Sequence, residues 1–229
     1  MKNKLFISAL VIVFLFLMAF WGLSKNFKNQ NGNPETTGSH MISETESFRV
    51  VPVDLRLLIK PHSPVKGAFN SKVTIVEFLD PECEACGGMY PIVKKIIKEH
   101  EADVKLVVRY MTYHGNSKYV ANILEGARAQ NKYWEALEIL FATQEQWASH
   151  HDPKPDLIPE ILKPLNLDMK KIITDAKAGK YDKQITEDSN DGKTVGVSGT
   201  PTFFVNGHML QELGIDSLKS AVIESLNRQ

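Results

Sequence analysis

The sequence predicts an α/β fold with a helical domain inserted into it, and three observations support this. A β-branched run over residues 73–79 is typical of a buried strand, and apolar residues at helical spacing and a second strand over 104–111 follow it. Residues 117–190 then carry apolar side chains at helical spacing. The strand pattern returns at 202–205. Strand, helix and strand in succession favour a parallel pair joined by a crossover connection.

The α/β part therefore consists of two segments, residues 48–116 and 191–229, on either side of the helical insertion. The first segment opens with an apolar stretch over 48–59, which fits a strand or a short helix packed on the main body. In the second segment, Asn206-Gly207 predicts a tight hairpin turn with a return strand directly after it. Asp216 is placed to cap a last amphipathic helix.

The composition is that of an ordinary globular protein and excludes several classes. The chain has 229 residues, 43% of them hydrophobic and 24% charged, which excludes disordered, collagen-like and low-complexity proteins. Its 27 basic residues equal its 27 acidic ones, so we expect no nucleic-acid partner. Residues 1–28 contain four lysines and no acidic residue. The rest of the chain therefore has 27 − 4 = 23 basic and 27 acidic residues, a net charge of −4.

The N-terminus predicts export. Residues 5–23 form an uncharged apolar run that is just long enough to span a bilayer core of about 30 Å at about 1.5 Å per residue. Lys2 and Lys4 precede it, so residues 1–24 fit an uncleaved signal anchor or a cleaved signal peptide. Residues 25–47 are polar and read as a flexible linker. We expect a cell-envelope protein, tethered to the inner membrane by the apolar run.

The two cysteines of the chain, Cys83 and Cys86, carry the chemistry that the sequence predicts. Two cysteines exclude a disulfide-dense scaffold and an all-cysteine zinc site. They follow a buried strand and begin a helix, whose N-terminus stabilises the reactive thiolate form. Their spacing puts both sulfurs in one helical turn. We expect Cys83 to be the exposed nucleophile and Cys86 to be the buried resolving thiol.

Three other interpretations of the cysteine pair are weaker. A zinc site needs two further ligands, and the seven histidines are scattered without finger-like spacing. Two unrelated buried cysteines are not expected to share one turn directly after a strand. A purely structural disulfide would close a very short loop and add about 2 kcal/mol at best. We therefore predict no metal site, an exposed loop end at His150 and His151, and no chemical role for His114.

Four features point to one family. A run over residues 76–80 leads directly into Cys-Glu-Ala-Cys, and Pro91 lies eight residues after Cys83, where thioredoxins have a proline within the helix. The helical insertion, which includes residues 132–137, is typical of the DsbA-like branch. The segment Gly-Val-Ser-Gly-Thr-Pro-Thr-Phe-Phe-Val-Asn-Gly covers residues 196–207. In these features the sequence resembles the DsbA-like thiol:disulfide oxidoreductases of the thioredoxin superfamily.

The resemblance extends from about Ser63 to Asn227 and implies a thioredoxin-like fold with roles for three further residues. Pro201 corresponds to the cis-proline that faces the cysteine pair, and the backbone of Thr200 would thereby pair with an extended substrate peptide. Glu77 corresponds to a buried acid that relays the proton of Cys86. The alternatives are an ordinary trans proline and an acid on an exposed strand face.

The resemblance implies an enzyme, a protein thiol:disulfide oxidoreductase. Its redox group is the Cys83–Cys86 disulfide, so we expect no metal and no organic cofactor. Cysteine-containing envelope proteins would be its substrates, and a membrane redox partner would reset the disulfide. Strong oxidants of the family often have Pro-His between the cysteines. Glu84 stands here instead, with no histidine to help, so we expect a higher Cys83 pKa than in those oxidants.

A less stabilised Cys83 thiolate makes the pair less oxidising, so the residues themselves leave the direction of electron flow open. The resemblance to the DsbA-like branch favours oxidation. We predict DsbA-like oxidation of substrates. A disulfide reductase or isomerase on the same scaffold is one alternative, and a redox-inert adaptor that binds extended peptides is another. Isomerases of this kind dimerise through an extra N-terminal domain, for which residues 24–60 are too short.

Overall fold

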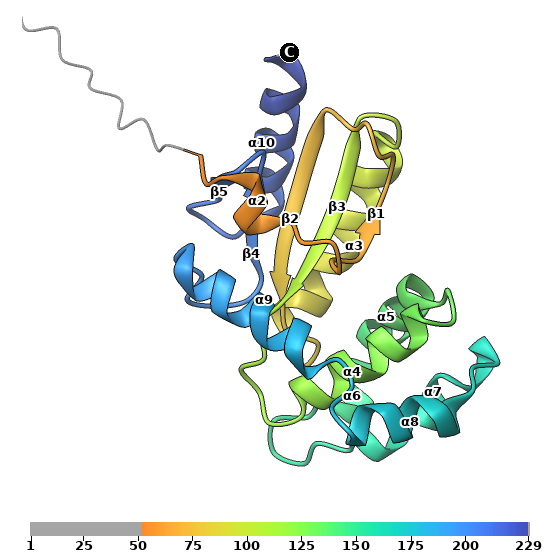
Figure 1. Ribbon diagram of the computed structural model, residues 1–229. Helices are drawn as coiled ribbons and strands as arrows, with labels where there is room; N and C mark the ends of the chain where they lie inside the picture. The colour runs from red at the N-terminus through yellow and green to blue at the C-terminus, as the bar shows by residue number, and fades with distance from the viewer. Residues whose placement is uncertain (1–51, 229) are drawn as a thin grey trace, which may run out of the picture. The chain divides into compact units, whose positions relative to one another are not determined.

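The computed structural model describes residues 52–228, which form a five-stranded mixed sheet covered by helices (Figure 1). The strand order is β1-β3-β2-β4-β5, so the first predicted strand lies at the centre. Only the pair β2 and β3 is parallel, as the sequence predicts. The two-residue edge strand β1 has no counterpart in the sequence prediction. The strands are β1 Val65–Lys66, β2 Val73–Leu79, β3 Val104–Tyr110, β4 Thr202–Val205 and β5 His208–Met209.

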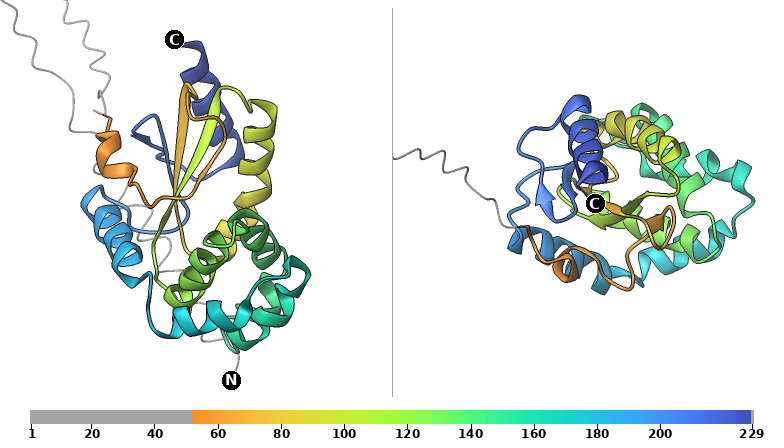
Figure 2. Two further views of the ribbon diagram at one scale, coloured as in Figure 1. Left: turned by 45° about the vertical axis from the view of Figure 1, so that its right-hand side comes forward. Right: turned by 90° about the horizontal axis from the view of Figure 1, so that it is seen from above.

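Helices cover both faces of this sheet. The helices α3 (Glu84–Glu99) and α10 (Ile215–Asn227) lie on one face, and α2 (Leu55–Leu58) and α9 (Asp182–Thr194) lie on the other (Figure 2). Every residue of β2 is buried, because the strand is sandwiched between the two helical layers. A thioredoxin-like α/β sandwich is therefore present.

The side chains of β2 alternate between two hydrophobic cores. Ile75 and Leu79 join the core under α3 and α10, whereas Val76 and Phe78 join the core under α2 and α9. This alternation follows from the period of two in a strand. It puts Glu77 on the same face as Ile75 and Leu79, and therefore on the side of the helix that begins with the cysteines.

Residues 117–177 are mostly helical, as predicted, and lie beyond the carboxyl ends of β2 and β3 (Figure 1). The predicted helical block ends at residue 190, inside α9, which packs on the sheet instead. Tyr133 and Trp147 are buried here and belong to the same core as the strands. The indole N–H of Trp147 donates a hydrogen bond of 2.9 Å to the carbonyl of Leu140. The elements are α4 Ser117–Arg128, α5 Tyr133–Ala142, α6 Gln144–Trp147, η1 Pro155–Leu157, α7 Ile158–Ile161, η2 Lys163–Leu165 and α8 Met169–Lys177.

A buried arginine, which the sequence did not single out, joins the sheet to its second helical layer. Arg109 of β3 is fully buried and donates to Asp188 at 2.6 Å and to Asp191 at 2.5 Å, both on α9. It also donates to the carbonyl oxygens of Leu57 and Leu58 on α2. One guanidinium therefore donates hydrogen bonds to acceptors of two helices. A buried charge needs such partners, because it has lost its contact with water.

The second α/β segment forms the predicted hairpin, with a difference at its last helix. Asn206 and Gly207 have φ values of +47° and +87°, as a tight hairpin turn requires, and β5 follows directly. The helix α10 has Gly214 as its N-cap, with no side-chain capping bond. The prediction that Asp216 caps this helix is wrong. Asp216 lies inside the first turn, where a negative charge still interacts favourably with the helix dipole.

The apolar stretch at 48–59 contains the short helix α2 rather than a strand in its described part. The predicted anchor or signal at 1–24 and the predicted linker at 25–47 lie outside the described residues. None of the helices within residues 52–228 is long and apolar enough to cross a membrane.

Candidate active site

Both cysteines lie at the start of α3, directly after the turn that ends β2. Cys83 is the N-cap residue, and its carbonyl accepts the amide hydrogen of Gly87 at 3.1 Å. Cys86 lies inside the first turn and is fully buried. The expectation that Cys83 is exposed is wrong, since only 9% of the residue is accessible. Both residues are free thiols, which corresponds to the reduced form of the pair.

The two thiols have opposite electrostatic environments. A hydrogen bond with Cys86 is the main cause that lowers the pKa of Cys83 to about 5. Hydrogen bonds with the Thr200 side chain and with the backbone of Cys86 and Ala85 add to this effect, and burial opposes it. The pKa of Cys86 is raised by burial, by its hydrogen bond with Cys83 and by the negative charge of Glu77. A thiolate at neutral pH therefore belongs on Cys83.

The segment around Pro201 lies against Cys83, although 117 residues separate Cys83 from Thr200 in the chain. The peptide bond between Thr200 and Pro201 is cis. The Cys83 thiol donates a hydrogen bond of 3.2 Å to the Thr200 carbonyl. The alternative of an ordinary trans proline is thus excluded.

Glu77 is fully buried beneath the cysteine pair, which excludes the alternative of an exposed strand face. Neither of its carboxylate oxygens has a hydrogen-bond partner among the described residues. Burial raises the pKa of Glu77 to about 8, and the charge of Cys83 contributes. An unpaired buried carboxyl group favours the protonated form, because ionisation in a low-dielectric interior is costly.

A family model described as Thioredoxin matches residues 60–224. The chain belongs to the thioredoxin family. Its fold is also found in solved members of the DsbA and BdbD type. Oxidised BdbD from Bacillus subtilis has a TM-score of 0.66 and 24% identity over 72% of this chain and 94% of that chain. The thiol-disulfide exchange protein alpha-DsbA2 from Wolbachia pipientis has a TM-score of 0.61 and 20% identity over 73% and 89%.

Thioredoxin-family sequence similarity also extends to parts of larger proteins. The Na(+)/H(+) antiporter NhaA 3 of Salinispora tropica is 28% identical over 178 residues, which are 76% of this chain and 26% of that protein. NhaA of Herminiimonas arsenicoxydans is 26% identical over 180 residues, or 76% of this chain and 28% of that protein. The chain thus spans about a quarter of the length of the curated relatives that it matches.

Two buried acids, Asp80 and Glu82, hold the loop after β3 by hydrogen bonds. The sequence analysis did not single them out. Asp80 accepts the backbone amides of Tyr113 at 2.7 Å and of His114 at 3.2 Å, and also the hydroxyl of Ser117. Glu82 accepts the backbone amide of Asn116 at 2.7 Å. Together they fix the loop after β3 beside the cysteine turn. The sequence signal was present, since these acids flank the proline directly before the cysteines.

His114 is the second feature that the sequence prediction missed. Its Nδ1 lies 2.9 Å from the Asp80 carboxylate. Burial lowers the pKa of His114, but the hydrogen bond and charge of Asp80, and the charges of Cys83 and Glu82, outweigh it and leave this pKa raised. His114 is absent from the main causes that set the Cys83 pKa, so the expectation that no histidine helps this thiolate remains to be tested.

Glu84, the first of the two residues between the cysteines, points its carboxylate toward solvent. The Glu84 side chain is 71% exposed, and its carboxylate lies 3.4 Å from Nε2 of His150. The rings of His150 and His114 lie 5.6 Å apart. Glu84 is absent from the main causes that set the Cys83 pKa. Among residues 52–228, no group of three or more His, Cys, Asp or Glu side chains is arranged to hold a metal ion.

Proposed function

We propose that the protein is a DsbA-like thiol:disulfide oxidoreductase that oxidises cysteine-containing proteins of the cell envelope through Cys83 and Cys86. The observation that carries this proposal is the Cys83 sulfur, which is held at a helix N-terminus, lies 3.2 Å from the Thr200 carbonyl and has a pKa lowered to about 5. A stabilised thiolate is a good leaving group in disulfide exchange. The proposed chemistry uses the disulfide itself and needs no metal or organic cofactor.

In the proposed reaction the protein begins with a Cys83–Cys86 disulfide. A substrate thiolate attacks the Cys83 sulfur, which forms a mixed disulfide and releases Cys86 as a thiolate. A second substrate thiolate then attacks the substrate sulfur of the mixed disulfide and expels Cys83. The substrate gains one disulfide, and the protein is left with two reduced cysteines. A membrane redox partner, acting as the oxidant, would restore the protein disulfide.

The buried Glu77 has a role in this sequence because Cys86 must take up a proton when it leaves. The pKa of the Cys86 thiol is raised, so its thiolate is a strong base in the interior. Glu77 lies on the strand face toward α3, and its pKa of about 8 keeps it protonated at neutral pH. We assign to it the transfer of this proton to Cys86.

Thr200 and Pro201 would bind the substrate segment next to the reacting sulfur. The cis peptide bond turns the chain, and the Thr200 carbonyl faces Cys83. An extended peptide that pairs with this backbone would present its own cysteine to Cys83, in the manner of strand addition. Envelope localisation is proposed from the apolar run at residues 5–23.

The low Cys83 pKa favours the oxidising direction. A thiolate that is stabilised in the reduced protein makes the disulfide form the stronger oxidant. The test is the reduction potential of the pair, measured against glutathione. We expect a value more oxidising than the thioredoxin value of about −270 mV. A value at or below that level would support the reductase alternative.

Clients can be identified with Cys86→Ala, which leaves Cys83 in stable mixed disulfides with its substrates. We expect envelope proteins with cysteine pairs to be captured, and Cys83→Ala to capture none. Full retention of the cellular function in a Cys83→Ala/Cys86→Ala double variant would favour the redox-inert adaptor and contradict the proposal.

A further inference from the structure

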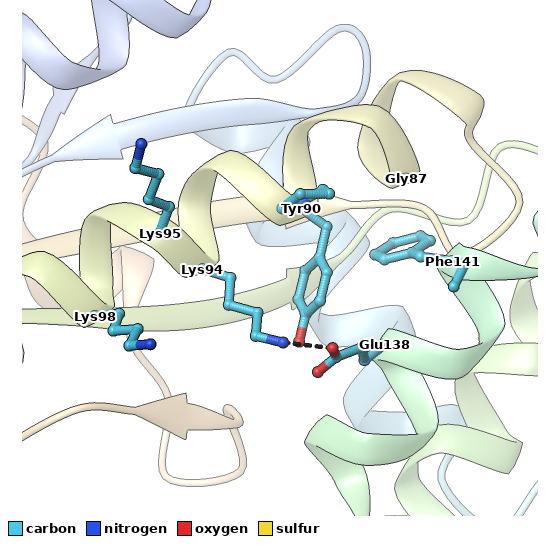
Figure 3. A pocket seen from close by; sticks show the side chains of 9 residues that line it. Gly87, Tyr90, Lys94, Lys95, Lys98, Glu138 and Phe141 are labelled. Atoms are coloured by element: carbon cyan, nitrogen blue, oxygen red, sulfur yellow. Dashed lines mark hydrogen bonds and ion pairs between the residues drawn. The ribbon is translucent and has the colours of Figure 1, made fainter.

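A groove runs along the seam between α3 and α5 and begins beside the cysteine pair. Its apolar part has a volume of about 590 Å³ and is lined by the rings of Tyr90 and Phe141, with lysines along its rim (Figure 3). A second hollow of about 580 Å³ shares Gly87 and Phe141 with the first and reaches Glu84, the residue after Cys83. The two hollows therefore form one path that leads away from the reactive sulfur.

The two ends of this α3/α5 groove have opposite charges. The far end is lined by three lysines, Lys94, Lys95 and Lys98, and one acid, Glu138. Lys94 pairs with Glu138, as the dashed line in Figure 3 marks, and Lys95 lies 3.7 Å from Glu99. Lys98 has no ion-pair partner among residues 52–228. The end nearest the cysteines has two acidic residues and no lysine or arginine in its lining.

Two features of the groove have no explanation within residues 52–228. A Cβ atom added at Gly88 would meet nothing within 4 Å, so packing does not require a glycine that weakens the helix. The buried Tyr90 hydroxyl has no hydrogen-bond partner among the described residues, and Figure 3 places it beside the Lys94–Glu138 pair. Both features fit a groove kept open for a second chain, which approaches the helix backbone at Gly88.

We propose that this groove docks protein substrates and selects segments with acidic residues several positions away from the reacting cysteine. The inference rests on the proposed function, because it assigns a substrate class to the same site. From Glu84 to Lys98 the helix is about 21 Å long at 1.5 Å per residue. An extended peptide spans this length in about six residues. Acids at that position would face Lys95 and Lys98, and an apolar side chain before them would fill the hollow.

Whole-molecule charge does not account for such a preference. Residues 29–229 have 23 basic and 27 acidic side chains, a net charge of −4, which repels acidic peptides at long range. A preference for acidic substrates would therefore have to come from the local lysines of the groove.

The test uses synthetic peptides and the protein in its disulfide form. One peptide has two cysteines, an apolar residue and a pair of glutamates about six positions from the first cysteine. Matched peptides have glutamines or lysines in place of the glutamates. With equal amounts of protein and peptide, the peptide thiols become a disulfide while Cys83 and Cys86 become thiols, so no other oxidant is needed. We expect the acidic peptide to react about fivefold faster than the neutral one at low salt, with the difference lost at high salt.

Three variants test whether the preference for the acidic peptide arises in the groove. Lys95→Gln/Lys98→Gln should remove most of the difference between the acidic and neutral peptides. Gly88→Leu should slow the acidic peptide by filling the groove without weakening the helix. Lys170→Gln/Lys177→Gln, a pair of exposed lysines on α8, should change nothing.

The outcomes separate the two proposals. Equal rates for all three peptides, or an acidic preference that survives Lys95→Gln/Lys98→Gln, would overturn the groove inference. Failure to react with any of the three peptides would instead overturn the proposed function.

Discussion

At the scale of single residues, the environment of Cys83 decides what the pair can do. The sulfur lies beside the Thr200 carbonyl at a helix N-terminus, whereas Cys86 lies near the unpaired carboxyl group of Glu77. Neighbouring residues of one helical turn thus have thiols of very different acidity. This difference supports a nucleophile and a resolving thiol within a single turn.

Glu77 gives the folded protein a distinct pH dependence. Its pKa is about 8 when folded, whereas an exposed glutamate titrates near about 4.3. Between these values the unfolded chain releases the proton and the folded chain keeps it. The contribution of Glu77 to the free energy of unfolding therefore falls as pH rises through this window, whereas the lowered pKa of Cys83 contributes in the opposite direction in the reduced protein.

We expect Glu77→Gln to remove most of this loss, which is on the order of a few kcal/mol at about 1.4 kcal/mol per pKa unit. Urea unfolding of the reduced protein at pH 5 and at pH 8 measures it. Glu101→Gln, an exposed control, should keep the slope of the wild type. An unchanged slope in Glu77→Gln would mean that another group causes the pH dependence.

His114 should contribute to the acidity of Cys83. The groups around it are Asp80, Glu82 and Cys83, with the tilted His150 ring 5.6 Å away, and they leave the pKa of His114 raised. His114→Gln should raise the Cys83 pKa by about half a unit to one unit, as expected for the loss of a nearby partial charge. Ultraviolet absorbance of the thiolate against pH reports it directly. His151→Gln is the control, and an equal shift in both variants would exclude a specific effect.

At the scale of elements, α3 is tightly packed at one glycine and unpacked at the next. Gly87 and Gly88 are adjacent in its second turn, yet their surroundings differ. A Cβ atom at Gly87 would overlap the amide oxygen of Gln144, whose nitrogen donates 3.0 Å hydrogen bonds to the carbonyls of Pro81 and Cys83. A Cβ atom at Gly88 would meet open space.

The difference between Gly87 and Gly88 predicts opposite effects of alanine on the free energy of unfolding at the two positions. Gly88→Ala should raise the free energy of unfolding by about 0.5 to 1 kcal/mol, because alanine favours the helix. Gly87→Ala should lower it by about 1 kcal/mol or more, since Gln144 must move and lose its hydrogen bonds. Urea unfolding of both variants measures the difference. Equal effects of the two substitutions would contradict the packing described for this turn.

The second helical layer depends on Arg109. Replacing it with leucine would take the arginine partner from the buried Asp188, which would keep His62 at 2.8 Å, and would free the carbonyls at the end of α2. We expect Arg109→Leu to cost about 3 to 5 kcal/mol, the range for breaking a buried ion pair. Arg228→Leu removes an exposed pair with Glu224 and should cost less than about 1 kcal/mol. Thermal unfolding of the two variants compares the buried pair with the exposed one.

At the scale of the whole described part, the sheet and the helical insertion share one hydrophobic core. Ile75 of the central strand, Tyr133 and Trp147 of the insertion and Leu218 of the last helix all belong to it. Helices and strands that bury one continuous core are expected to lose their structure together. The insertion should therefore not unfold separately from the sheet that supports the site.

Urea unfolding should accordingly follow one transition. Trp147 fluorescence, measured with Trp21→Phe and Trp134→Phe, reports on the insertion, and hydrogen exchange of the β2 amides reports on the sheet. We expect midpoints that coincide for the two probes. A loss of the Trp147 signal at clearly lower urea, with β2 still protected, would establish the insertion as a separate folding unit.

The sequence by itself determined the central strands, the helical stretch, the hairpin and the position of the cysteine pair. These follow from local patterns, namely β-branched runs, apolar periodicity, an Asn-Gly turn and two cysteines one turn apart. Only the tertiary structure brought Thr200 to Cys83, paired Arg109 with α9 and joined His114 to Asp80. Local patterns could not predict these contacts, because each joins segments that are distant in the chain and depends on how helices pack around the sheet.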